Sequence, residues 1–322
     1  MSKLRMLSIG TATQDVFLVG KKVFTPVKGA DGKLFEHIPL GAKLDLDDVV
    51  FSTGGNASNA AVTFARAGLD SMFMGVAGTD PAGQAVMSDL DREEVDTRYV
   101  HQQDKYRTAY STLLLAPNGE RTVLRYGGHS LSDTGRELEL KAISEANWLY
   151  VSSVGSIELL EKIISRAAGL GVQVAYNPSP LELKQPAKLR ALLEDVSVLI
   201  ANKEEMSLLV EGKNLEELAR HATNVVSIAA VTDGMRGSVT SDGKWLIKAG
   251  MYENVPIVDR TGAGDAYGSG LVAMLAQGKS LAEATLFASA NATSVVTEIG
   301  AKAAILAKGA RLHTMPLTIN KV

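Results

Sequence analysis

The sequence of 322 residues contains no cysteine, which excludes disulfide bonds, thiol catalysis and cysteine-ligated zinc. It also lacks a charge surplus, because 33 Lys and Arg residues against 36 Asp and Glu residues give a formal net charge of −3. Domains that bind nucleic acids normally carry a clear basic excess that neutralises phosphates. We therefore expect no nucleic-acid partner.

Long apolar runs are missing as well. The longest stretch without a charged residue, Val49 to Ala65, is shorter than the ~20 apolar residues of a spanning helix and is interrupted by Thr53-Gly54-Gly55-Asn56. Near the N-terminus, Gly10 and Thr11 break the apolar stretch and no convincing cleavage site follows, so a secretory signal peptide is not expected. These absences predict a cytoplasmic protein without a membrane partner.

What is present is an ordinary globular composition, with 46% hydrophobic residues and enough length for a large core. No linker, repeat or low-complexity tract divides residues 1–322, so we expect a single domain. Short β-branched runs alternate with helical stretches, which predicts βαβ units and a mainly parallel sheet covered on both faces. The predicted strands span residues 6–10, 72–76, 148–151, 172–176, 197–201 and 227–231. The predicted helices span residues 57–67, 157–170, 204–211, 215–222, 262–277 and 281–297.

Two segments interrupt this alternation. Residues 16–51 are strand-like with a turn signal at Gly29-Ala30-Asp31-Gly32, and residues 98–126 alternate with period two around Asn118-Gly119, a strong hairpin signal. Neither segment suits a central parallel sheet. We expect them to form a small β-sheet that covers the site as a lid; surface hairpins without that role are the alternative.

The segment Asp259-Arg260-Thr261-Gly262-Ala263-Gly264-Asp265 leads directly into a predicted helix. Glycines let a phosphate approach the backbone, and the N–H groups at a helix start favour negative charge. Such a turn suits the charge of a transferring phosphoryl group, and Asp265 could accept a proton from an attacking hydroxyl. The alternative is a glycine-rich turn in which the helix dipole stabilises Asp265.

Three further polar turns occur. Asn56 and Asn59 are three residues apart on one helix face, where their amides could bind polyol hydroxyls or cap the helix. Asn202 and Glu205 could aim oxygens at Mg²⁺, directly or through its water shell, or form a capping box. Residues 232–237 are a candidate nucleotide-phosphate turn.

In this order, the segments resemble the ribokinase, or PfkB, family of carbohydrate kinases. The resemblance covers nearly the whole chain, and the Thr-Gly-Ala-Gly-Asp core is its most specific part. It is carried by Gly10 to Asp15, Gly54 to Asn59, Asn177-Pro178-Ser179-Pro180, Asn202 to Glu205, Thr232 to Gly237, Asp259 to Asp265 and Gly300-Ala301.

The resemblance implies a ribokinase-like three-layer α/β/α fold with a flanking β-sheet lid. It also implies transfer of the γ-phosphoryl group of ATP, with Mg²⁺, to a hydroxyl of a small sugar or sugar acid. Asp265 would be the catalytic base, with Gly262, Ala263 and Gly264 as the anion hole. The other implied roles are acceptor binding by Asp15, Gly55, Asn56 and Asn59, nucleotide binding by Asn202, Thr232, Gly234, Gly237 and Ser289, Mg²⁺ binding through water by Glu205, and a K⁺ site at Asp259 and Thr261 near Gly300.

Some features depart from the ribokinase pattern. Asn56 stands where ribokinases proper carry Lys, Arg260 replaces a frequent Thr, and residues 21–48 are longer than a minimal lid. A longer lid is closer to nucleoside-phosphorylating relatives, so a nucleoside kinase is the main alternative, and a non-catalytic sugar- or nucleotide-binding regulator is the third. Lys28, Lys43 and Arg107 are candidates for a sugar-phosphate cluster. An exposed lid could also pair two subunits into a homodimer.

Overall fold

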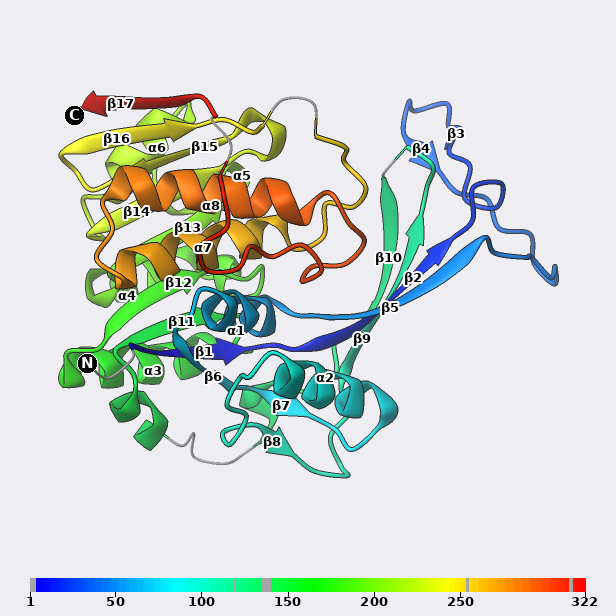
Figure 1. The fold of residues 1–322 in the computed structure, drawn as a ribbon, viewed down its shortest axis with the longest axis horizontal. Coiled ribbons are helices and arrows are strands. Elements are labelled where there is room, and N and C mark those ends of the chain that lie inside the picture. The colour runs from blue at the N-terminus through cyan, green and yellow to red at the C-terminus, as the bar shows by residue number, and fades with distance from the viewer. Residues whose placement is uncertain (1–3, 119, 135–139, 253–254, 313–314) are drawn as a thin grey trace.

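A nine-stranded sheet forms the centre of the molecule in the computed structural model, which describes residues 4–118, 120–134, 140–252, 255–312 and 315–322 (Figure 1). The strand order is β17-β16-β15-β14-β13-β12-β11-β1-β6, parallel from β6 to β14 and antiparallel from β14 to β17. The strands are β1 (Arg5–Gly10), β6 (Asp70–Met74), β11 (Trp148–Ser152), β12 (Gln173–Asn177), β13 (Val198–Asn202), β14 (Ile228–Thr232), β15 (Ser238–Ser241), β16 (Trp245–Ala249) and β17 (Leu317–Lys321).

Helices cover both faces of this sheet, because alternate residues of its strands point to opposite sides. Leu7 and Ile9 of β1 belong to the core under one helical layer, whereas Met6 packs into the core under the other. The first layer holds α3 (Ile157–Leu170), α4 (Pro186–Leu192), α5 (Lys203–Leu209) and α6 (Leu215–Ala222). The second holds α1 (Asn56–Arg66), α7 (Ala263–Ala276) and α8 (Leu281–Val295), and α2 (Pro81–Arg92) packs beside α1. Short 3₁₀ turns span Leu131–Thr134, Leu140–Glu145, Glu182–Lys184, Leu193–Asp195 and Gly234–Arg236.

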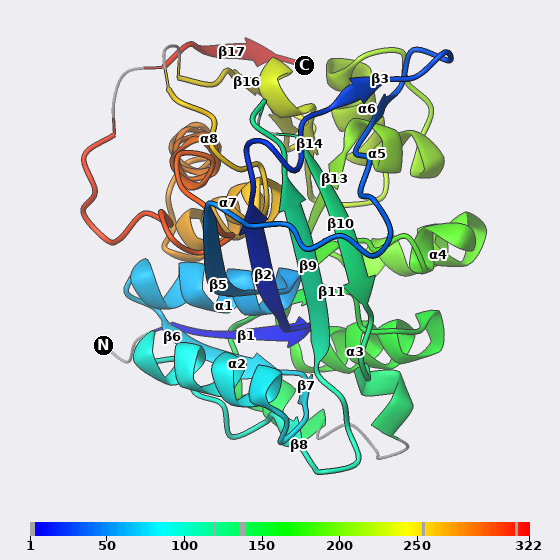
Figure 2. The same ribbon diagram turned by 90° about the vertical axis from the view of Figure 1, so that its right-hand side faces the viewer.

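A separate four-stranded sheet, which we call the lid, projects from the body in the order β10-β9-β2-β5 (Figures 1 and 2). Its strands are β2 (Thr13–Val19), β5 (Asp48–Gly54), β9 (Ala109–Leu115) and β10 (Arg121–Tyr126). Between β2 and β5, the hairpin of β3 (Val27–Lys28) and β4 (Leu34–Phe35) lies toward the tip, and its turn closes where Gly29 N donates to Lys33 O at 2.8 Å. The prediction of a small flanking sheet is confirmed.

The structure corrects the lid limits at both ends. β2 begins at Thr13 rather than at residue 16, and residues 98–108 stay outside the four-stranded sheet, since β8 (His101–Gln102) pairs with β7 (Val76–Ala77). Gly119, on which the hairpin signal rests, lies outside the described residues. The hairpin itself is present, because β9 and β10 are antiparallel and Ala116 N donates to Glu120 O at 3.0 Å.

Other elements match the sequence prediction closely. Helices 157–170 and 215–222 have the expected ends, whereas α8 stops at Val295, two residues earlier than expected. The strand expected at 72–76 is divided, because Gly75 leaves the ladder with β1 and β7 pairs instead with β8. Across the described ranges, no helix is both long and apolar enough to span a membrane.

Candidate active site

The parallel strands of the central sheet end at one edge, beneath the base of the lid. Gly10, Ser152, Asn177, Asn202 and Thr232 are the last residues of β1, β11, β12, β13 and β14. In open α/β sheets, ligands bind at the carboxyl ends of the strands, because the loops there enclose a crevice. The polar segments singled out in the sequence lie at this edge.

The turn before α7 has the geometry expected of an anion site. Gly262 caps the helix with φ +80°, and a Cβ there would lie 2.4 Å from the Cβ of Ala301, so only glycine fits. At Gly264, in contrast, a Cβ would meet nothing within 4 Å. The backbone of the first helical turn is therefore open to a ligand, and its N–H groups favour negative charge.

Asp265 lies in this first turn and is held by an amide from another helix. Asn59 Nδ2, on α1, donates a hydrogen bond to Asp265 Oδ2 at 2.8 Å. Removal from water raises the pKa of Asp265 to about 6; the Asn59 hydrogen bond opposes this shift, and the charges of Asp15 and Glu205 add to it. A carboxylate with this pKa is ionised at neutral pH and still basic enough to take a proton.

The raised pKa predicts a pH dependence of the reaction. Below about pH 6 the protonated form of Asp265 dominates, so kcat/KM should fall by about tenfold for each further pH unit. A pH–rate profile between pH 4.5 and 8 measures this fall, with nucleotide binding followed over the same range as a control. A flat profile between pH 5 and 7 would contradict the assignment of Asp265 as the base.

A cavity of about 310 Å³ opens beside Asp265, toward the lid. Asp15, Gly55, Asn56 and Asn59, the four predicted acceptor residues, line it together with Asp265. Asp15 is buried, which raises its pKa, and it accepts hydrogen bonds from Thr13 and Ser111. We call this space the acceptor cavity.

Two neighbouring glycines at the start of α1, of which Gly55 lines this cavity, serve different needs. Gly54 leaves room for Asp15, since a Cβ at residue 54 would lie 2.2 Å from Asp15 Oδ2. Gly55 adopts φ +94° at the start of α1, and a Cβ there would lie 2.6 Å from the Thr11 carbonyl oxygen. The glycine pair thus lets β5 turn into α1 while two strands approach each other closely.

The hydrogen bonds of Asn56 continue into the central sheet. Asn56 Nδ2 donates to Ser152 Oγ at 3.2 Å, and Ser152 Oγ donates to Asn177 Oδ1 at 3.3 Å. Asn177 in turn donates to the carbonyl oxygen of Ile200 at 2.9 Å. This chain fixes the Asn56 amide at the ends of β11 and β12. Ser152, which does not line the cavity but contacts Asn56, was not among the residues predicted from the sequence.

A second cavity, of about 200 Å³, lies on the other side of the Gly262–Asp265 turn. Thr232, Gly234, Gly237 and Ser289, four of the predicted nucleotide residues, all line it, as do Ala263 and Gly264 of the turn. We call it the nucleotide cavity. Asn202, the fifth predicted nucleotide residue, is not part of this lining, although it pairs with Thr232 in register at the strand ends.

Asn202 and Glu205 form the capping box that the sequence left open as an alternative. Asn202 Oδ1 accepts from Glu205 N at 2.9 Å, and Glu205 Oε2 accepts from Asn202 N at 3.0 Å. Burial raises the pKa of Glu205, and its charge contributes to the raised pKa of Asp265. The metal-binding role of Glu205 stays a prediction.

The residues of the predicted K⁺ site form hydrogen bonds with one another. The carboxylate of Asp259, which is 1% exposed, accepts from Thr261 N and Oγ1 at 3.0 and 2.7 Å and from Gly300 N at 3.1 Å. Arg121 Nε of the lid lies 4.0 Å from Asp259 Oδ1. The K⁺-binding role of Asp259 and Thr261 stays a prediction. In the described ranges, no three His, Cys, Asp or Glu side chains gather as metal ligands.

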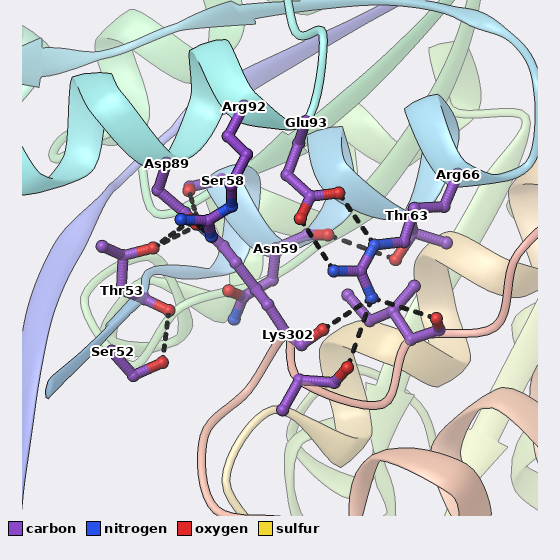
Figure 3. A network of polar contacts seen from close by, with 12 residues as sticks. Ser52, Thr53, Ser58, Asn59, Thr63, Arg66, Asp89, Arg92, Glu93 and Lys302 are labelled. Carbon is purple, nitrogen blue, oxygen red and sulfur yellow. Dashed lines mark hydrogen bonds and ion pairs between the residues drawn. The ribbon is translucent and has the colours of Figure 1, made fainter. Parts of the chain in front are cut away.

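A buried lysine, Lys302, which was not predicted from the sequence, anchors the segment after α8 beneath the lid (Figure 3). Lys302 is 5% exposed, and its Nζ donates to Thr53 Oγ1 at 2.8 Å, Ser58 Oγ at 2.6 Å and Asp89 Oδ2 at 2.9 Å. Burial lowers the pKa of Lys302, whereas the charge of Asp89 opposes that shift. Lys302 thereby ties the segment that packs on Gly262 to β5, α1 and α2.

Arg66 supports the same segment from α1. Its guanidinium donates to both carboxylate oxygens of Glu93 at 2.8 Å and to the carbonyl oxygens of Lys302 and Ile305 at 2.9 and 3.1 Å (Figure 3). Such a fork binds planar acceptors firmly, because several N–H groups lie in one plane. Arg66 and the side chain of Lys302 therefore hold the same segment, which packs on Gly262.

The cations suggested by the sequence are not the ones that face the acceptor cavity. Lys28 and Lys43 do not contribute to the described lining, and Arg107 borders a different hollow. Arg121 and Arg125 of β10 line the cavity instead. Their period-two spacing could have revealed a shared face, but sequence alone does not tell which face of a strand turns inward.

Comparison with known proteins agrees with this geometry. Residues 14–308 match the pfkB family of carbohydrate kinases. The chain is 27% identical over 263 residues to a ribokinase of Haemophilus influenzae, covering 78% of this chain and 83% of that protein. It is 28% identical over 326 aligned positions to the probable fructokinase-7 of Arabidopsis thaliana, covering 92% of each.

A solved structure shares the fold. The Arabidopsis thaliana ribokinase complexed with ribose and ATP superposes with a TM-score of 0.78 at 20% sequence identity, covering 95% of this chain and 96% of that one. The chain therefore belongs to the pfkB family of carbohydrate kinases. It is a phosphotransferase with the ribokinase fold, as the sequence resemblance implied.

Proposed function

We propose that this protein transfers the γ-phosphoryl group of ATP to a hydroxyl of a small sugar or sugar acid. The observation that carries the proposal is the position of one turn between two cavities. Gly262 and Asp265 border the acceptor cavity, whereas Ala263 and Gly264 border the nucleotide cavity. A phosphoryl group on this turn would thus lie between donor and acceptor. The complex of the structural neighbour with ribose and ATP supports the same choice of ligands.

Each residue of the turn has a distinct task in this reaction. Asp265 accepts the proton of the acceptor hydroxyl as its oxygen bonds to the γ-phosphorus and the bond to the β-phosphate oxygen breaks, releasing ADP. The N–H groups of residues 262–264 stabilise the negative charge that spreads over the phosphoryl oxygens. Asn59 keeps the carboxylate aimed into the acceptor cavity through its 2.8 Å hydrogen bond.

Magnesium fits this arrangement through Glu205. Loss of contact with water raises the pKa of both Asp265 and Glu205, and the charge of Glu205 raises the pKa of Asp265 further. A hydrated divalent cation there would relieve that repulsion, with Glu205 holding it through water. When bound, Mg²⁺ would neutralise charge on the phosphates of the nucleotide.

The test is ATP consumption by the purified protein with Mg²⁺, with and without K⁺, across a panel of acceptors. The panel contains ribose, fructose, keto-deoxy sugar acids, sugar phosphates, adenosine, cytidine and pseudouridine. Turnover with a sugar or sugar acid is the expected result. Turnover with nucleosides alone would instead establish a nucleoside kinase. ATP binding without any turnover would overturn the proposal in favour of a regulator.

If the acceptor were a nucleoside, the long segment 21–48 would be expected to face its base. In the described lining of the acceptor cavity, no residue comes from that segment, and the β3–β4 hairpin lies toward the tip of the lid (Figure 1). A sugar-sized acceptor is therefore the better match to the cavity.

Gly264→Ala tests the anion hole without a folding penalty. Because a Cβ at residue 264 meets nothing within 4 Å, the new methyl group would project into open space on the ligand side of the turn. We expect unchanged or slightly higher stability, since Ala is the better helix former, and a fall in kcat of about 10²-fold from misplacement of the phosphoryl group.

Gly169→Ala in α3 is the matched control, because a Cβ at that exposed helical position also meets nothing within 4 Å. Thermal unfolding and steady-state kinetics of both variants are measured side by side. Equal activity of the two variants would show that no ligand approaches Gly264.

A further inference from the structure

Strand β10 of the lid turns two arginines toward the acceptor cavity and two large apolar side chains away from it. Arg121, Val123 and Arg125 face the acceptor cavity, whereas Leu124 and Tyr126 point away and are 58% and 54% exposed. A sheet that only covered a site would turn its apolar residues inward and its charges outward. The lid therefore brings cations to the cavity at the cost of exposed apolar surface.

The beginning of β10 is tethered to the turn before α7. Arg121 Nε lies 4.0 Å from Asp259 Oδ1, and the neighbouring Glu120 pairs with Arg260 at 3.2 Å. Arg121 thus sits toward the phosphoryl end of the cavity, and its charge is balanced by Asp259. The two contacts join the beginning of β10 to the turn before α7.

Arg125 differs from Arg121 because its charge is unbalanced. Its guanidinium forms no hydrogen bond or ion pair with any residue that the structure describes. Four residues along a strand amount to about 13 Å, so Arg125 stands well away from Asp259. A guanidinium presents paired N–H donors that match a carboxylate or a phosphate.

The register of the lid places Arg125 at the acceptor end of the cavity. Arg125 lies opposite Ser111 on β9, and Ser111 lies opposite Asp15 on β2. Ser111 also hydrogen-bonds to Asp15, the residue that we expect to bind acceptor hydroxyls. The three side chains form one row across the inner face of the lid.

We propose that the acceptor is an anionic sugar, whose carboxylate or phosphate group is bound by Arg125 at the end remote from the phosphorylated hydroxyl. The inference rests on the proposed kinase function and narrows its substrate class. A carboxylate and a phosphate offer Arg125 the same paired oxygens, so the experiment separates them.

The experiment compares kcat/KM for matched acceptors: ribose and fructose, ribonate and gluconate, ribose 5-phosphate and fructose 6-phosphate. Wild-type protein should have a higher kcat/KM for either the sugar acids or the sugar phosphates than for the neutral sugars. Arg125→Gln should lower that preference by about 10- to 100-fold, the effect of losing a hydrogen bond to a charged group. Arg125→Lys should restore part of it, because the charge remains while the paired geometry is lost.

Lys28→Gln provides the control, since it removes one positive charge from the β3–β4 hairpin, outside the cavity lining, and should leave the preference unchanged. An edge strand can also carry inward charges merely to prevent pairing with other chains. In that case Arg125→Gln would change all acceptors by the same factor, which would overturn the inference.

Failure of the inference is distinguishable from failure of the proposed function. Turnover of neutral sugars equal to or better than that of both anionic sets would refute the anionic acceptor while confirming a sugar kinase. ATP binding without turnover of any acceptor would refute both. A preference for acids or for phosphates identifies which anion Arg125 binds.

Discussion

Asp265→Asn should lower kcat by about 10²- to 10⁴-fold, the usual effect of losing a general base. Asparagine keeps the size of the side chain and an oxygen that can accept the hydrogen bond from Asn59, so the geometry at the start of α7 should persist. Only the ability to take a proton is lost. Steady-state kinetics with the best acceptor measures the effect, and binding of ATP should be largely retained.

The same variant should be at least as stable as the wild-type protein at neutral pH. The pKa of Asp265 is about 6 in the folded protein and about 4 in an unfolded chain, so its ionisation disfavours the folded state as pH rises through this window. The substituted amide would carry no charge to bury, and its advantage should vanish below about pH 4.

The exposed Asp91→Asn on α2 is the control for a general effect of the substitution, and it should alter neither kcat nor stability. Full turnover by Asp265→Asn would mean that another group takes the proton. Loss of ATP binding would mean that the variant disturbs the turn rather than the chemistry.

Lys302→Met should lower the free energy of unfolding by about 3 kcal/mol, a large part of the 5–15 kcal/mol typical of a folded domain. The ammonium group donates to Thr53, Ser58 and Asp89, and its removal leaves the buried Asp89 carboxylate with less compensation. Methionine matches the length of the lysine stem but offers no donor. Urea unfolding measures the loss.

Lys308→Met, six residues further along the same segment, is exposed and should change stability by less than about 0.5 kcal/mol. A double-mutant cycle with Asp89→Asn isolates the contribution of the ion pair, because removing both charges should cost less than the sum of the single changes. A loss below about 1 kcal/mol for Lys302→Met would show that water replaces the ammonium group.

The sequence predicted those parts of the site that are local in the chain. The turn at residues 259–265 joins a glycine pair, a helix start and a carboxylate within seven positions, so a role in phosphoryl transfer could be predicted without knowledge of the fold. The capping box at Asn202 was one of two alternatives that the sequence left open, and the alternation of strands and helices indicated the parallel sheet. The structure confirms the ribokinase fold that these motifs implied.

Parts of the site that depend on distant contacts could not be read in the same way. Lys302 and Asp89 are 213 positions apart, and nothing near either residue signals that the two meet. The inward direction of Arg125 follows from its register with Ser111, which sequence alone does not fix. In contrast, α2 was missed although Asp80 caps it and Pro81 begins it, both ordinary signals of a helix start.

The two cavities draw most of their linings from different parts of the chain, which bears on how such an enzyme can diversify. Most residues that line the acceptor cavity lie before residue 127, although Gly262 and Asp265 also line it, whereas the lining of the nucleotide cavity comes from residues 232–296. Substitutions before residue 127 can therefore change which molecule binds in the acceptor cavity, while the residues that line the nucleotide cavity stay the same.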